Sequence, residues 1–150
     1  TLRSGAYQTA IKEASSDVDV VARAWPLLVP LAEEGWVDHA VTRLTLKTYL
    51  ADFVEAQVDT LVLGCTHYPV FKEVLLDVLA TEFDGYALNL VDSAETLALD
   101  LSASLVARGQ AAPNRVGRRT FFCTDAPERF ARVGDTFFPG DLGAVQVVDI

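Results

Sequence analysis

The sequence predicts an α/β fold with a parallel sheet, and three observations support this prediction. Short β-branched or apolar runs alternate along the chain with longer segments whose apolar residues recur at helical spacing. Single helical segments separate the strand-like runs, and this order favours parallel strands that helices cover on both faces. Of the 150 residues, 51% are hydrophobic and 22% are charged, which is enough apolar material for a globular core.

Caps, prolines and turn residues set the expected element boundaries. Ser4 is a suitable N-cap for the first helix, Pro26 ends the first strand, and Pro69 suits the first turn of a helix. Asp92 and Ser93 are N-cap candidates for a later helix. In chain order, the expected strands are residues 18–24, 59–63, 87–91, 120–123 and 144–149. The expected helices are residues 4–14, 42–56, 69–81, a helix from Asp92 or Ser93 to residue 107, and residues 127–132. Residues 27–34 form a short mixed segment, and residues 109–117 (GQAAPNRVG) form the best linker candidate.

Charge and composition exclude several classes of partner. Twelve Lys and Arg against 21 Asp and Glu give a net charge of −9, which argues against nucleic acid and anionic membranes as partners. The longest stretch without charge is residues 60–71, too short for a membrane-spanning helix of about 20 residues. Two cysteines do not make a disulfide framework, so we expect a reducing compartment and a cytoplasmic location.

The most informative motif follows the strand predicted at residues 59–63. Ligands of open α/β sheets bind beyond the carboxyl ends of the strands, and Cys65 lies just past such an end. The helix expected next would direct free N–H groups and its positive dipole end to the same place, where they bind carboxylates and favour a thiolate. Gly64 leaves room for a ligand, and His67 can exchange protons with it. This set suits proton transfer at a carbon atom.

Other kinds of site find less support in the chain. It has neither a GxxxxGK phosphate loop nor a GxGxxG motif. Cys65 and His67 supply two ligands where a zinc site needs three or four, so we expect no metal. The alternatives for these residues are a small buried cysteine and a hydrogen-bonded structural histidine. Trp25, Trp36, Phe53 and Phe71 are expected in the core or at an interface between lobes.

Residues 61–69 read LVLGCTHYP, which resembles the second active-site signature of the glutamate racemases within the wider amino-acid racemase family. Four further segments resemble the family in the same order. They are RSGAY at residues 3–7, PLLVPLAEEG at 26–35, VDSAETLA at 91–98 and TDAPERF at 124–130. The resemblance covers nearly the whole chain. It implies a flavodoxin-like racemase lobe and an enzyme without a cofactor.

The resemblance also implies roles for individual residues. The family uses two cysteines on opposite faces of the substrate α-carbon, and Cys65 matches the second of them. His67 matches the histidine that assists this cysteine, and Glu33 matches a supporting carboxylate; a solvated helix end is the alternative for Glu33. Thr66 and Gly64 match substrate-contacting positions. Thr1 is expected to match the last threonine of a substrate-contacting GTxxT stretch.

The resemblance covers only the C-terminal portion of the family pattern. The sequence starts at Thr1 without any methionine, and the first family cysteine, in its Asn-Thr context, is not in it. We therefore expect residues 1–93 to form the second lobe without its first strand, and residues 94–150 to return to the other lobe. Cys123, the other cysteine, is expected to pack in the core. The exposed apolar surface of such a portion predicts self-association or pairing with the N-terminal segment.

Three functions follow from these expectations. The first is interconversion of L- and D-glutamate, which supplies D-glutamate for peptidoglycan, with glutamate as the small-molecule substrate. The second is an aspartate or other amino-acid racemase on the same fold. The third is a non-catalytic module that binds a carboxylate, and it rests on the absence of the second cysteine from the 150 residues.

Overall fold

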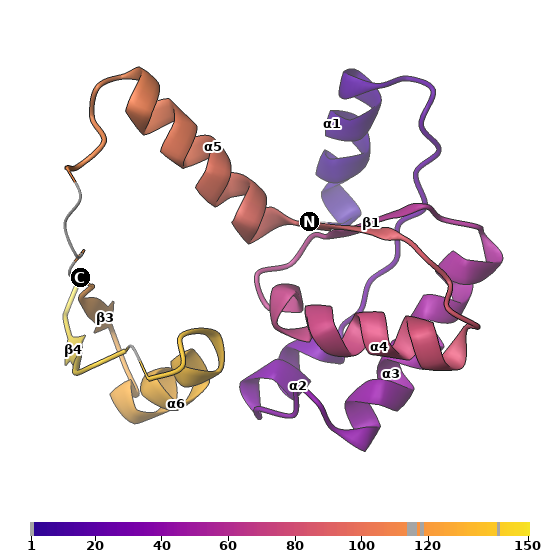
Figure 1. The fold of residues 1–150 in the computed structure, drawn as a ribbon. Coiled ribbons are helices and arrows are strands. Elements are labelled where there is room, and N and C mark those ends of the chain that lie inside the picture. The colour runs from indigo at the N-terminus through magenta and orange to yellow at the C-terminus, as the bar shows by residue number, and fades with distance from the viewer. Residues whose placement is uncertain (1, 114–116, 118, 141) are drawn as a thin grey trace.

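The computed structural model describes residues 2–113, 117, 119–140 and 142–150 (Figure 1). Its helices are the 3-10 helices η1 (Leu2–Ser4) and η2 (Tyr68–Phe71) and the α-helices α1 (Ala6–Ala14), α2 (Leu28–Glu33), α3 (Ala40–Glu55), α4 (Lys72–Glu82), α5 (Ser93–Ala107) and α6 (Pro127–Phe137). Its strands are β1 (Thr60–Leu63), β2 (Asn89–Asp92), β3 (Phe121–Cys123) and β4 (Val145–Val147).

The strands of the described residues form two parallel pairs, which confirms the predicted α/β class with parallel strands. In the first pair, β1 lies beside β2 in a register that aligns Thr60 with Asn89 and Leu63 with Asp92. In the second pair, β3 lies beside β4 and Cys123 aligns with Val147. Helix α5 begins directly after β2 and leads away from the first pair, and the second pair comes after it in the chain (Figure 1).

The hydrophobic core lies between β1 and the helices on one of its sides. Figure 1 shows α2, α3 and α4 on this side of the first strand pair and α1 on the other. Leu46 and Leu50 of α3 are fully buried, as are Leu75 and Leu79 of α4. The two residues of each pair are four positions apart, so they lie on one face of their helix and pack against the facing helix.

Residues 18–24 were expected to form a strand, but the structure shows no strand there. A β-branched run favours extended backbone, but a strand also needs a neighbour that accepts and donates main-chain hydrogen bonds. Among the described residues, β1 pairs only with β2, and residues 18–24 belong to neither strand pair. Residues 18–24 therefore have no partner strand among the described residues.

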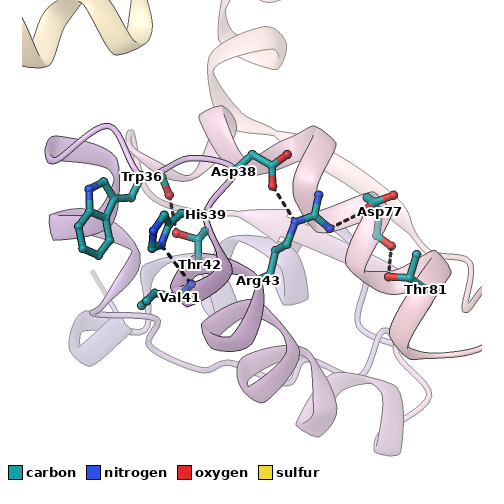
Figure 2. Close-up of polar contacts among 8 residues, drawn as sticks. All are labelled: Trp36, Asp38, His39, Val41, Thr42, Arg43, Asp77 and Thr81. Atoms are coloured by element: carbon teal, nitrogen blue, oxygen red, sulfur yellow. Dashed lines mark hydrogen bonds and ion pairs between the residues drawn. The ribbon is translucent and has the colours of Figure 1, made fainter.

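Three of the four aromatic residues expected in the core or at an interface between lobes lie in the core. Trp25, Phe53 and Phe71 are buried in the core, but Trp36 is 45% exposed. The Trp36 ring packs on the imidazole of His39, with ring centroids 4.3 Å apart. His39 is the N-cap of α3, and its Nδ1 accepts a hydrogen bond from the main-chain N–H two residues later (Figure 2).

A charged cluster joins α3 to α4 on the surface. Figure 2 shows the Arg43 guanidinium between Asp38, which precedes α3, and Asp77 of α4. The hydrogen bond from Arg43 holds the pKa of Asp38 below its usual range, and both carboxylates raise the pKa of Arg43. This cluster connects the start of α3 to α4 by exposed ion pairs.

No helix in the described part of the chain is long and apolar enough to cross a membrane.

Candidate active site

The carboxyl ends of β1 and β2 meet at the segment that the sequence singled out. Leu61 and Leu63 of β1 are buried, which anchors the strand and brings Gly64 and Cys65 to its end. Asp92, the last residue of β2, aligns with Leu63, and the hydroxyl of the next residue, Ser93, donates a hydrogen bond to the Leu63 carbonyl at 3.2 Å. The pairing of β1 with β2 and the hydrogen bond from Ser93 thus fix the position of the segment that begins at Gly64.

The helix after Cys65 starts differently from the expectation. A 3-10 helix, η2, comes first, and the α-helix α4 begins only at Lys72. The main-chain N–H of Tyr68 donates to the Cys65 carbonyl at 3.1 Å, and Pro69 occupies the first turn as expected. The α-helix expected at residues 69–81 therefore begins at Lys72 instead of Pro69, because the chain first closes a tight 3-10 turn.

Cys65 is half-buried and lines a large cavity beside β1. The cavity has a volume of about 1290 Å³, larger than the roughly 300–1,000 Å³ of small-molecule pockets. Gly64, Thr66 and Ser93 line it next to Cys65, and α1 and residues 17–25 line its other side. The structure thus brings three of the expected site residues, Gly64, Cys65 and Thr66, to the wall of one cavity.

Tyr7 of α1 closes the cavity wall over Gly64. A Cβ atom built on Gly64 would lie 3.2 Å from Cε2 and 3.3 Å from Cζ of the Tyr7 ring. A side chain at this position would press on the ring, and the ring would have to shift by a few tenths of an ångström to make room. Tyr7 was not singled out by sequence, although it lies in the RSGAY segment.

His67 and Glu33 form a second group beside the cavity. Nε2 of His67 lies 3.6 Å from Oε1 of Glu33, at the end of α2, and Nδ1 lies 3.3 Å from the Thr66 hydroxyl. Neither His67 nor Glu33 is among the described residues that line the cavity. Thr66 lines it, so the contacts run from Glu33 through His67 to Thr66 at the cavity wall. Glu33 also pairs with Arg129, which sequence reasoning missed.

Tyr68 connects the site to the core. Its hydroxyl donates a hydrogen bond to the Trp25 main-chain carbonyl at 3.0 Å. The rings of Trp25 and Tyr68 also pack together, with centroids 6.0 Å apart. Burial raises the pKa of Tyr68, and negative charge on nearby Cys65 raises it further. Tyr68 also lines the cavity, and its position in GCTHYP was the available sequence signal for its role.

Two expected residues remain. Thr1 lies outside the described residues. Cys123 is on β3 and half-buried, not in the core cluster, which corrects the expectation of core packing. It is not among the described residues that line the cavity with Cys65, and both cysteines are free thiols.

Comparison with known proteins finds close relatives along the whole chain. A glutamate racemase of Geobacter metallireducens is 46% identical over 151 residues, which cover 100% of this chain and 54% of the relative. A crystal structure of the Francisella tularensis glutamate racemase with D-glutamate matches 99% of this chain and 54% of its own, with a TM-score of 0.84 and 28% identity. The Thermus thermophilus glutamate racemase, crystallised with β-chloro-D-alanine, matches 100% of this chain and 53% of its own, with a TM-score of 0.79 and 36% identity.

No family model matches the chain. The chain spans about half the length of the curated relatives it matches. The sequence motifs, the parallel strands and these relatives agree with one another. In sequence and in fold, the chain corresponds over its whole length to the C-terminal portion of the glutamate racemases.

Proposed function

We propose that this chain is the C-terminal portion of an enzyme that interconverts L- and D-glutamate. The observation that carries the proposal is the position of Cys65, half-buried at the carboxyl end of β1 and on the wall of an open cavity. The relative from Francisella tularensis was crystallised with D-glutamate, and the one from Thermus thermophilus with another small D-amino acid. A small amino acid is therefore the substrate class that the relatives support.

Cys65 acts as the acid and base on one face of the substrate. Its thiolate removes the α-proton of L-glutamate, the electron pair of the C–H bond stays on the α-carbon, and a thiol on the opposite face returns a proton. Two groups are needed because a single base would have to move around the planar intermediate. Cys123 is not this partner, since it lies on β3 away from the cavity wall. The partner thiol belongs to a part of the protein beyond these 150 residues.

The residues around Cys65 bind the substrate and tune the proton transfer. Gly64 and Thr66 contact the substrate from the cavity wall. When Nδ1 of His67 accepts a hydrogen bond from the Thr66 hydroxyl, the oxygen lone pairs of Thr66 remain free for the substrate. Glu33 faces Nε2 and holds the imidazole in this tautomer. Thr1 completes the substrate-contacting set.

Residues 1–93 form one lobe in this proposal, and residues 94–150 return to the other. The exposed side chains of α5 support such an arrangement, since none of the 15 residues of this helix is buried. Leu97, Leu99, Leu101 and Val106 are between 54% and 68% exposed. A helix with so much exposed apolar surface packs against another part of the protein or against a second copy. The isolated chain is expected to self-associate, and a single monomeric species in sedimentation velocity would contradict this.

The direct test is a racemisation assay of the intact protein, followed by circular dichroism. The circular dichroism signal of L-glutamate is expected to decay to zero, while the signals of L-aspartate and L-alanine stay unchanged. Cys65→Ser is expected to remove the activity, and Cys123→Ser, the matched control, to retain it. Turnover of aspartate alone would assign the protein to the other racemases of the family. Glutamate binding without turnover by the intact protein would favour a non-catalytic carboxylate-binding module.

A further inference from the structure

Helix α6 reaches the His67 site from a distant part of the chain. Arg129, in its first turn, places NH2 3.0 Å from Oε2 of Glu33, although the two residues are 96 positions apart. The other carboxylate oxygen of Glu33 faces the His67 ring. Phe137, at the end of the same helix, packs perpendicular to this ring with centroids 5.5 Å apart. α6 therefore contacts both Glu33 and His67.

Glu33 needs this second partner to keep its orientation. Its side chain is flexible and 32% exposed, and the 3.6 Å contact with His67 is longer than an ordinary hydrogen bond. The contact with Arg129 is a charge-assisted hydrogen bond of ordinary length. With one oxygen held by Arg129, the other is directed at Nε2 of His67.

Arg132, the other arginine beside this group, does not contact the Glu33 carboxylate as Arg129 does. Arg132, one turn later on α6, donates to the main-chain carbonyl of Glu33 at 3.5 Å and pairs with the Glu34 carboxylate at 3.6 Å. Neither contact restricts the Glu33 carboxylate. The two arginines thus make similar surface ion pairs with neighbouring glutamates, but the structure connects only the pair made by Arg129 to His67.

We propose that Arg129 is a positioning residue for proton transfer, acting through Glu33 on His67 and Thr66. This role rests on the proposed racemase function. In it, the C-terminal segment contributes to the site without touching the substrate. Loss of Arg129 leaves Cys65 and the cavity wall in place and releases the Glu33 carboxylate, so turnover falls more than substrate affinity.

Kinetics of the intact protein test this role. Arg129→Gln is expected to lower kcat about three- to fivefold, the size of effect that one partly exposed ion pair supports, with little change in KM. Arg129→Lys is expected to restore most of the loss, because the charge remains. In a Glu33→Gln background, Arg129→Gln is expected to have no further effect, since the two residues act in series. Arg132→Gln is the matched control and is expected to keep the wild-type kcat.

Three kinetic outcomes would overturn the proposal. They are an unchanged kcat in Arg129→Gln, an equal loss in Arg129→Gln and Arg132→Gln, and full additivity with Glu33→Gln. The equal loss would mean that both arginines only dock α6.

A spectroscopic measurement keeps this test separate from the racemase proposal. Histidine-labelled intact protein is observed by NMR, and the His67 imidazole resonances are assigned with a His67→Gln variant. Arg129→Gln and Glu33→Gln are expected to shift these resonances in the same direction, and Arg132→Gln to leave them in place. Unmoved resonances in Arg129→Gln would refute the coupling even in an active enzyme. If the intact protein shows these shifts but does not racemise glutamate, the proposed function is rejected, while the coupling of Arg129 to His67 through Glu33 still holds.

Discussion

The Tyr68 hydroxyl donates a hydrogen bond to the main-chain carbonyl of Trp25, 43 positions earlier in the chain, at 3.0 Å. This bond ties the turn after Cys65 to the segment that leads into α2. Glu33 lies at the end of α2, and His67 directly precedes Tyr68. The bond therefore helps to bring Glu33 to His67, and so it links the core to the candidate active site.

The pKa of Tyr68 gives a prediction in alkaline solution. Burial raises this pKa above the ordinary value near 10. The unfolded chain ionises first as the pH rises, so the folded state loses stability from about pH 10 upward. Titration followed at 295 nm is expected to show a late-ionising tyrosine that disappears in Tyr68→Phe. In Cys65→Ser this ionisation is expected to move to lower pH, because a nearby negative charge is removed. If the Tyr68→Phe variant still shows the late ionisation step, the step does not belong to Tyr68 and the assignment is contradicted.

The packing of Trp25 gives a prediction about stability. Its ring lies 5.7 Å from that of Tyr49 and 5.6 Å from that of Phe53. Trp25→Ala is expected to lower the free energy of unfolding by about 3–5 kcal/mol, as measured in urea. Trp36→Ala, at a 45% exposed position, should cost about 1 kcal/mol or less.

A second substitution separates the packing of Trp25 from its polar atom. The indole Nε1 is buried and has no hydrogen-bond partner in the described residues. Trp25→Phe removes this unpaired donor, which offsets part of the lost packing, so its expected cost is below about 1.5 kcal/mol. Equal losses in Trp25→Ala and Trp25→Phe would show that the aromatic contacts do not hold this region together.

The close approach of Tyr7 to Gly64 gives a third prediction. Gly64→Ala is expected to destabilise the protein by about 1 kcal/mol, because the new methyl group presses on the Tyr7 ring. In a Tyr7→Ala background the same substitution should cost nothing, since the ring is gone. Equilibrium unfolding of the four proteins in this cycle measures the coupling. The same penalty with and without the ring would mean that another contact requires the glycine.

Much of the fold could be predicted because its signals are local. The helical spacing of apolar residues places α3 within two residues of the expected ends, and Asp92 accepts hydrogen bonds from the first N–H groups of α5 as an N-cap should. Residues 18–24 could not be predicted in the same way. Their composition favours a strand, but pairing depends on a neighbour that local sequence does not reveal.

The candidate site shows the same division between local and distant signals. Gly64, Cys65 and Thr66 could be predicted to share a site, because a strand end and adjacent positions bring them together. The contact of Arg129 with Glu33 had no sequence signal, since it joins residues 96 positions apart through the packing of α6 on α2. Tertiary packing therefore sets which groups surround His67.

The most direct measurement is the exchange of the α-proton of L-glutamate with deuterated water, followed by NMR or mass spectrometry in the intact protein. Cys65→Ser is expected to slow this exchange about a hundredfold or more, because the base on that face of the substrate is lost. Cys123→Ser is expected to exchange at the wild-type rate. Exchange at the wild-type rate in Cys65→Ser would contradict the account.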